Sequence, residues 1–278
     1  MASFVATAAT LASLVLILGS CGGPQVDPKS TKKSNNRTEL AKDFLGRNEL
    51  SAAHLEATKA IKHDGSNAEA HSILGLVNFL RGVNNFRLLE VDDCLTGIDA
   101  EGLGLEMSDF FKQAQVSFHK ATEIDAEYSE AYSNEASAAI QLDDYKLAIE
   151  LNEKALAVPH RLINLGLTRA NLGWARFKTG DAVGAAKDLR QSLQFNPEMC
   201  IAKYRLGRVY FEREEWNKAL QQFRAVVETE SCPLQEANLY FIRTMRQLSM
   251  NDEAQNAVEQ CIALAPQSCI AAQCKAGL

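Results

Sequence analysis

Residues 172–223 read LGWARFKTGDAVGAAKDLRQSLQFNPEMCIAKYRLGRVYFEREEWNKALQQF, and this stretch decides the fold. Two pairs of matching segments lie within it, each pair separated by 34 residues. Leu172-Gly173 is matched by Leu206-Gly207, and residues 181–186 (DAVGAA) are matched by residues 215–220 (EWNKAL). Self-similarity at a fixed period indicates a protein built from stacked structural repeats.

The period and the residue types resemble the tetratricopeptide (TPR) repeat, a pair of antiparallel helices. Gly173 with Ala185, and Gly207 with Ala219, are small enough to let the two helices of a pair approach closely. The turn TGD at 179–181 supplies a helix stop followed by a helix start. An unrelated amphipathic bundle does not explain the fixed spacing. We therefore expect an all-α fold, a TPR α-solenoid of about six helix pairs with a C-terminal capping helix.

The same pattern extends outward to both ends of the chain. Units begin near Ser34, Ala68, Ser129, Gly166, Cys200 and Gln235. An insertion at about 84–110 interrupts the second unit, and it is either a binding loop, a clasp over the groove, or a tolerated surface excursion. The expected organisation is a lipoprotein signal peptide at 1–20, a lipidated cysteine with a flexible tether at 21–37, and a TPR superhelix at 38–278.

The N-terminal segment predicts export. Residues 1–20 carry no charge, and their apolar run ends in small residues, as in a cleaved signal peptide. The sequence LGSC at 18–21 resembles a bacterial lipobox, which implies a covalent lipid on Cys21 and, with Gly22 next, an address on the periplasmic face of the outer membrane. Such signals normally start with a basic residue, and here the first is Lys29. A non-lipidated secretory peptide is the alternative.

Composition and motifs argue against several classes of function. The net charge is -6, with no long basic block, so we expect no nucleic-acid partner. The five histidines are scattered, no Cys-x-x-Cys occurs, and common nucleotide-binding and hydrolase motifs are missing from the sequence. We expect no enzyme activity, no metal, no small-molecule substrate, and no cofactor besides the lipid on Cys21.

The cysteines indicate an oxidising compartment. If Cys21 is acylated, six thiols remain, and fifteen pairings are possible if all six form disulfides. The repeat register favours Cys200 with Cys232, at neighbouring ends of the fifth helix pair, and Cys261 with Cys274, at the C-terminal end. Cys94 and Cys269 stay unassigned.

The first helix of each unit should line the inner surface of the curved array. Apolar residues fall there in the middle units and predict a groove for an amphipathic helix or an extended peptide. In the sixth unit Arg243 and Arg246 occupy such positions and could meet a carboxylate. The alternative is that several of the apolar side chains pack against the neighbouring repeat. The predicted groove residues are Leu76, Phe79, Leu80, Ile140, Trp174, Phe177, Tyr204 and Phe211.

A lipobox, a short tether and about six TPR units together resemble the type IV pilus pilotins, the PilF/PilW/Tgl group of outer-membrane lipoproteins. Cysteine-containing repeats and the count of six units look most like the myxobacterial Tgl branch. The resemblance implies a protein that binds secretin subunits and promotes their membrane insertion and multimerisation for type IV pilus assembly. The alternative function is a general TPR scaffold for another periplasmic or envelope complex.

Overall fold

The computed structural model describes residues 27–92 and 100–276. Within these ranges the chain forms thirteen α-helices, one short 3₁₀ helix and no strands. No helix in the described part is long and apolar enough to cross a membrane. The elements are α1 (Pro28–Gly46), α2 (Leu50–His63), α3 (Ala68–Asp92), α4 (Ala100–Ile124), α5 (Ser129–Gln141), α6 (Tyr145–Ala157), η1 (Pro159–Arg161), α7 (Leu165–Lys178), α8 (Ala182–Phe195), α9 (Cys200–Glu212), α10 (Trp216–Val227), α11 (Gln235–Gln247), α12 (Asn251–Leu264) and α13 (Cys269–Ala276).

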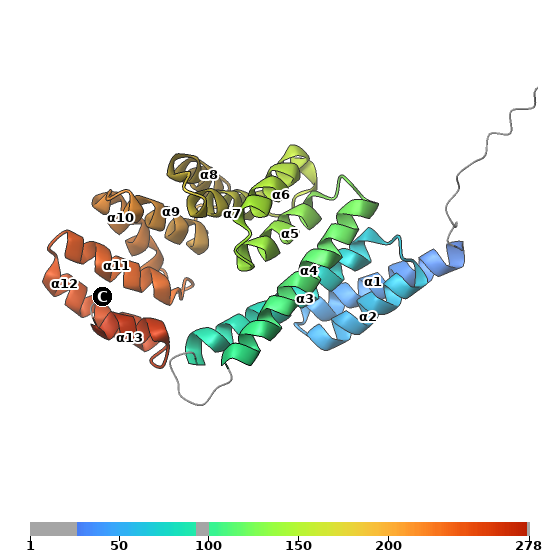
Figure 1. The fold of residues 1–278 in the computed structure, drawn as a ribbon, viewed down its shortest axis with the longest axis horizontal. Helices are drawn as coiled ribbons and strands as arrows, with labels where there is room; N and C mark the ends of the chain where they lie inside the picture. Colours follow the sequence, from blue (N-terminus) through green and yellow to red (C-terminus); the bar gives the residue numbers. More distant parts are fainter. Residues whose placement is uncertain (1–26, 93–99, 277–278) are drawn as a thin grey trace, which may run out of the picture.

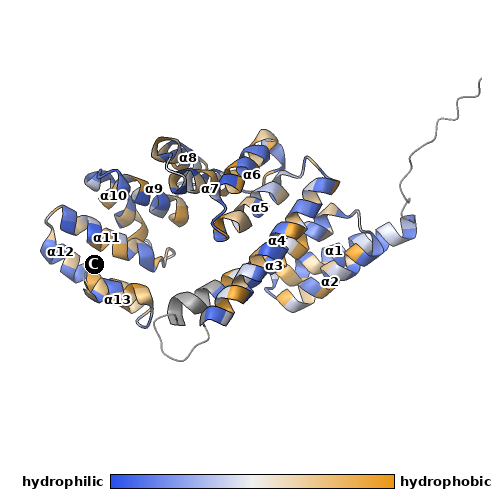
Figure 2. Cartoon of the chain, in the orientation of Figure 1, coloured by the Kyte–Doolittle hydropathy of each residue, from blue (hydrophilic) through white to orange (hydrophobic). Residues whose placement is uncertain are grey.

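The helices pack as six antiparallel pairs, from α1 with α2 to α11 with α12, and α13 covers the last pair. Each pair also contacts the next, so the array curves from α1 to α13 as a solenoid (Figure 1). The helices are banded orange and blue in Figure 2, as expected for helices with one apolar side facing a neighbour. The predicted fold class is confirmed.

The turn inside a helix pair has the same backbone geometry in five of the six units. One residue takes a positive φ: Asn48 (60°), Asp143 (58°), Gly180 (93°), Glu214 (57°) or Ser249 (61°). The N–H of the following residue then donates to a carbonyl five residues back, at 2.9 Å in each of the five turns. This is the bond that closes a Schellman motif, and it satisfies a carbonyl at the helix end.

Glycine sets the distance between the helices of a pair. A Cβ placed on Gly207 of α9 would lie 2.6 Å from the Phe223 ring of α10, and one on Gly75 of α3 would lie 2.6 Å from the Phe118 ring of α4. Both phenylalanines are completely buried. The missing side chain therefore makes room for an aromatic ring between the helices.

The flexible tether expected up to residue 37 is corrected by the structure, because α1 already begins at Pro28. The side chain of Asp27 caps the helix by accepting from the N–H of Lys29. Ser34 is fully buried, and its hydroxyl donates to the carbonyl of Ala60 in α2 at 2.8 Å. Polar residues that are typical of a linker are therefore part of α1, and Ser34 among them forms a hydrogen bond to α2.

The insertion expected at 84–110 as a loop is mostly helical. Residues 84–92 extend α3 and residues 100–110 extend α4, so each helix has 25 residues, against 13 in α5 and in α6. Gly82 lies against the ring of Phe111, and this ring lies 5.5 Å from that of Phe79. The lengthened hairpin runs across the open side of the arc toward α13, and α13 contacts α3 (Figure 1).

Candidate partner-binding surface

The first helices of units four to six, α7, α9 and α11, carry one connected group of aromatic rings. The Trp174 ring lies 5.3 Å from Phe177 and 6.5 Å from Tyr204, measured between centroids. Tyr204 lies 6.5 Å from Tyr240, and Tyr240 lies 5.2 Å from Phe211 in an edge-on arrangement. We call these five residues the inner aromatic cluster. Edge-on and tilted contacts of this kind add to the stabilisation that burial provides.

Arginine side chains lie over these rings. The guanidinium carbon of Arg208 is 3.8 Å from the centroid of Tyr240, 5.8 Å from that of Trp174 and 5.9 Å from that of Tyr204. Arg208 also donates to the hydroxyl of Tyr204 at 2.8 Å. Arg243 lies 5.1 Å from the Tyr240 ring. A cation over an aromatic face is attracted by the ring quadrupole, so the cluster holds these charges in place.

A chain of polar contacts links units three, four and five beside the cluster. Arg205 donates to the Asn171 carboxamide oxygen at 2.8 Å, and the Asn171 amide donates to the Ser137 hydroxyl at 2.9 Å. Arg205 also lies 5.5 Å from the Trp174 ring. Burial lowers the pKa of Arg205 to about 10, which leaves the guanidinium charged at neutral pH. Positive charge is therefore fixed on this face.

The eight predicted groove residues fall into two groups. Trp174, Phe177, Tyr204 and Phe211 belong to the inner aromatic cluster, and Ile140 packs with Trp174. The other group lies on α3, where Leu76 and Phe79 pack on the core formed with α4 and Leu80 is half-buried. Ile140 and Tyr204 are buried and the other six are half-buried. The structure therefore does not join all eight in one open groove, and several pack against neighbouring repeats.

Sequence reasoning missed Tyr240, Arg205 and Arg208 as members of this surface. The signal was present in the spacing, because Arg208 lies 34 residues after Trp174 and 35 residues before Arg243. Trp174, Arg208 and Arg243 therefore occupy the same position in the first helix of three successive units. The surface is consequently more cationic than the aromatic residues alone suggested, and it suits a carboxylate flanked by apolar or aromatic groups.

Disulfides close the C-terminal half of the solenoid. Cys200, at the start of α9, is bonded to Cys232, which follows α10, with 5.7 Å between the Cα atoms. Cys261 of α12 is bonded to Cys274 of α13, with 6.5 Å between the Cα atoms. Cys269 is also disulfide-bonded. Cys21 and Cys94 lie outside the described residues.

No three histidine, cysteine, aspartate or glutamate side chains gather as a metal site within residues 27–92 and 100–276. The arrangement on the inner surface is that of a recognition surface, with rings and guanidinium groups held by neighbouring side chains.

Comparison with known proteins agrees with this geometry. Residues 170–235 match the tetratricopeptide repeat family model. A TPR repeat-containing protein of Methanocaldococcus jannaschii is 26% identical over 122 residues, which are 44% of this chain and 21% of that protein. The chain thus spans about a fifth of the length of this curated relative. The fold and the family match together define the architecture as a TPR solenoid.

Two solved structures resemble nearly the whole chain. PilF of Pseudomonas aeruginosa is 17% identical with a TM-score of 0.65, covering 90% of this chain and 100% of PilF. PilW, described as a widely conserved type IV pilus biogenesis factor, is 21% identical with a TM-score of 0.64, covering 86% of this chain and 96% of PilW. At these identities the likeness concerns the fold.

Proposed function

We propose that this protein is a pilotin, a lipid-anchored TPR protein that binds secretin subunits and promotes their insertion and multimerisation in the outer membrane for type IV pilus assembly. The observation that carries the proposal is the match of nearly the whole chain to PilF and PilW. The alignments cover 100% of PilF and 96% of PilW, with TM-scores of 0.65 and 0.64. Within this group, the six units and the cysteines in the repeats favour the Tgl branch.

The inner surface of α7, α9 and α11 supplies the binding step of the proposal. A segment of the secretin monomer places apolar or aromatic side chains against Trp174 and Tyr240, and a carboxylate meets Arg208 and Arg243. Charge-assisted hydrogen bonds from arginine to a carboxylate are short and directional, so they fix the register of the segment. The bound segment is shielded from aggregation until it joins the ring.

The role is tested by the amount of heat- and SDS-resistant secretin multimer in outer membranes from cells with and without the protein. Loss of multimer while the secretin monomer is still present supports a pilotin. Normal multimers without the protein contradict this role, and they favour a TPR scaffold for another envelope complex.

The lipid anchor is tested separately at Cys21. We expect Cys21→Ser to abolish incorporation of labelled palmitate and to move the protein from the membrane fraction to the soluble periplasmic fraction. The physical reason is that each methylene of a buried acyl chain contributes about 0.8 kcal/mol to membrane attachment. Ser20→Ala, beside it, serves as the control and keeps the label. Unchanged labelling of the Cys21→Ser protein would refute lipidation at this residue.

A further inference from the structure

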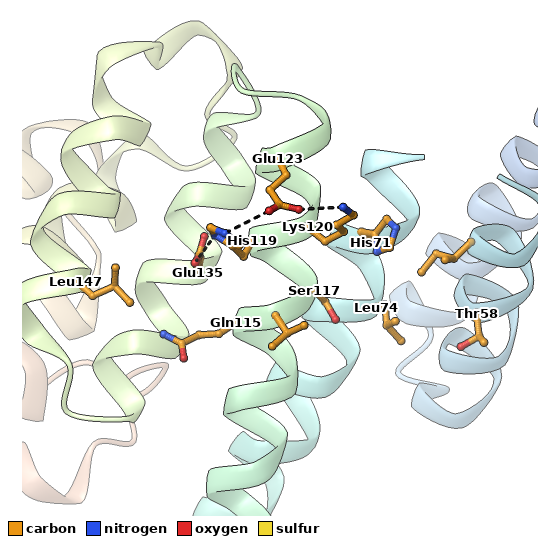
Figure 3. A pocket seen from close by; sticks show the side chains of 12 residues that line it. Thr58, His71, Leu74, Gln115, Ser117, His119, Lys120, Glu123, Glu135 and Leu147 are labelled. Carbon is orange, nitrogen blue, oxygen red and sulfur yellow. Dashed lines mark hydrogen bonds and ion pairs between the residues drawn. The ribbon is translucent and has the colours of Figure 1, made fainter. Parts of the chain in front are cut away.

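A second candidate site lies away from the inner surface, between the second helices of units one to three. It is a cavity of about 610 Å³ formed by side chains of α2, α3, α4, α5 and α6. Figure 3 shows Thr58 of α2 and Leu147 of α6 on opposite sides, with α4 between them. A volume of this size accommodates a small molecule or a few side chains of a partner.

Most of the cavity wall is apolar. Ile61, Leu74, Val116 and Leu147 line it, and Val116 is 70% exposed. A second depression of about 500 Å³ adjoins the first and shares Leu74, Val116 and Ser117 with it. The two together form a continuous trough centred on Val116, and its second part is also lined by polar side chains such as Asn78 and Gln113.

One end of the cavity holds a buried carboxylate. Glu135 of α5 is only 5% exposed, and its Oε1 lies 3.4 Å from Nδ1 of His119 on α4 (Figure 3). Its Oε2 is buried and has no hydrogen-bond partner. An unsatisfied buried oxygen is costly in free energy, and more so when it is charged. A ligand that donates to this oxygen would recover that free energy.

The cations near Glu135 are already engaged elsewhere. Lys120 of α4 pairs with Glu123 at 2.9 Å, and Lys154 of α6 pairs with Glu150 at 2.8 Å. His119 also faces Glu123, with 3.8 Å between its Nε2 and the carboxylate. Glu135 therefore lines the cavity with a carboxylate that faces His119 through Oε1 and has no hydrogen-bond partner at Oε2.

We propose that this cavity binds a lysine or arginine side chain presented by an extended apolar segment of a partner protein. The ammonium or guanidinium donates to the carboxylate of Glu135, and the methylene stem lies against Leu74 and Val116. The flanking residues of the partner fill the adjoining depression. Charge complementarity selects the cation, and the continuity of the two depressions selects a chain segment over a free amine.

The pH dependence follows from the same geometry. Burial raises the pKa of Glu135, opposed by the nearby His119 and Lys154 and aided by Glu150. Acidification protonates the carboxylate, which weakens its attraction for a cation. Binding of the lysine side chain should fall as the pH is lowered through the raised pKa of Glu135.

The test uses the purified protein and two capped peptides, Ser-Leu-Lys-Leu-Ser and the same peptide with norleucine in place of lysine. Binding is followed by the NMR shifts of the Val116 methyl groups. We expect the lysine peptide to bind at least tenfold more tightly, Glu135→Gln to remove this preference, and Glu253→Gln, an exposed residue of α12 far along the chain from the cavity, to keep it. Equal binding of the two peptides, or a preference retained in a folded Glu135→Gln protein, would overturn the proposal.

Two further variants and a small amine test where the peptide binds and what kind of ligand the site takes. Val116→Trp changes an exposed side chain and should block both peptides, and unchanged binding by this protein would refute the location. Butylammonium that binds as tightly as the lysine peptide would contradict a chain segment and leave a site for small amines. Arg208→Gln, on the inner surface, should not affect binding, so this site and the pilotin role are tested independently.

Discussion

At the scale of single residues, Asp188 of α8 is a buried carboxylate held by two ion pairs. It is 1% exposed and pairs with two arginines of α7, Arg169 at 3.1 Å and Arg176. Arg176 also reaches Glu153 of α6 at 2.8 Å. The carboxylate therefore joins both helices of unit four and, through Arg176, the unit before it.

We predict that Asp188→Asn lowers the free energy of unfolding by about 2 kcal/mol, measured by urea denaturation. The loss leaves two half-buried guanidinium groups without their counterion, and it is smaller than for fully buried arginines. Glu153→Gln removes an exposed carboxylate from the same network and should cost less than about 1 kcal/mol. Equal effects of the two substitutions would contradict this assignment.

Glu56 predicts a measurable dependence of stability on pH. Its side chain is 7% exposed and pairs at 2.7 Å with both Lys59 of α2 and Arg37 of α1. The hydrogen bond from Lys59, together with that from Arg37, lowers the pKa of Glu56 below its ordinary value of 4.5. A lowered pKa in the folded state means that this contribution to stability is complete above pH 4.5 and is lost as the pH falls through the folded-state pKa.

We therefore expect the wild-type protein to exceed Glu56→Gln in urea midpoint at neutral pH, and the difference to shrink as the pH is lowered below 4.5. Glu39→Gln, whose exposed carboxylate lies on the surface of α1, is the control and should show little difference at either pH. A difference for Glu56→Gln that does not change with pH would show that the pairing has no part in it.

At the scale of helices, the C-terminal end depends on a covalent link. The Cys261–Cys274 disulfide ties α13 to α12 and closes a short loop. End repeats of a solenoid have one neighbour, so they open first. We predict that Cys261→Ser/Cys274→Ser raises amide hydrogen exchange in α13 by at least tenfold. Exchange in α5 to α8 should not change, and unaltered exchange in α13 would mean that packing and the disulfide of Cys269 are enough to hold it.

The helices themselves were largely predictable, and the exceptions have a physical cause. The 34-residue period identified the helix pairs because small residues recur where two helices touch, as at Gly173 and Gly207. The start of α1 was missed because Ser34 reads as linker, while in the fold its hydroxyl binds α2. The helical insertion was missed because extra residues within a repeat suggest a loop, while in the fold residues 84–92 and 100–110 extend α3 and α4.

The binding surface was predictable only in part, since a ring at an inner position can face solvent or a neighbouring repeat. Tyr204 is 4% exposed because Phe223 and Tyr240 pack on it, a contact between helices that the sequence does not record. Arg208 was missed because it follows an aromatic residue, Trp174, at the matching position of the preceding unit. The residue type at this inner position differs from unit to unit, while the position within the unit stays the same.

At the scale of the whole molecule, the two proposed binding surfaces of the solenoid carry opposite charge. The inner surface of α7, α9 and α11 presents arginines held on aromatic rings, and the cavity between α2, α4 and α6 presents the carboxylate of Glu135. The lengthened α3–α4 hairpin runs toward α13 across the open side (Figure 1). We therefore expect a partner of the inner surface to enter a space bounded by this hairpin and by α13.

The central claim is that the cationic inner surface captures the secretin segment, and one complementation experiment tests it most directly. Cells lacking the protein receive Arg208→Gln/Arg243→Gln or the matched control Lys187→Gln/Arg190→Gln, which removes two charges from exposed positions of α8. Immunoblots first establish equal amounts of each protein. The account predicts that the control restores heat- and SDS-resistant secretin multimers and that the inner-surface variant does not. Full restoration by both would contradict it.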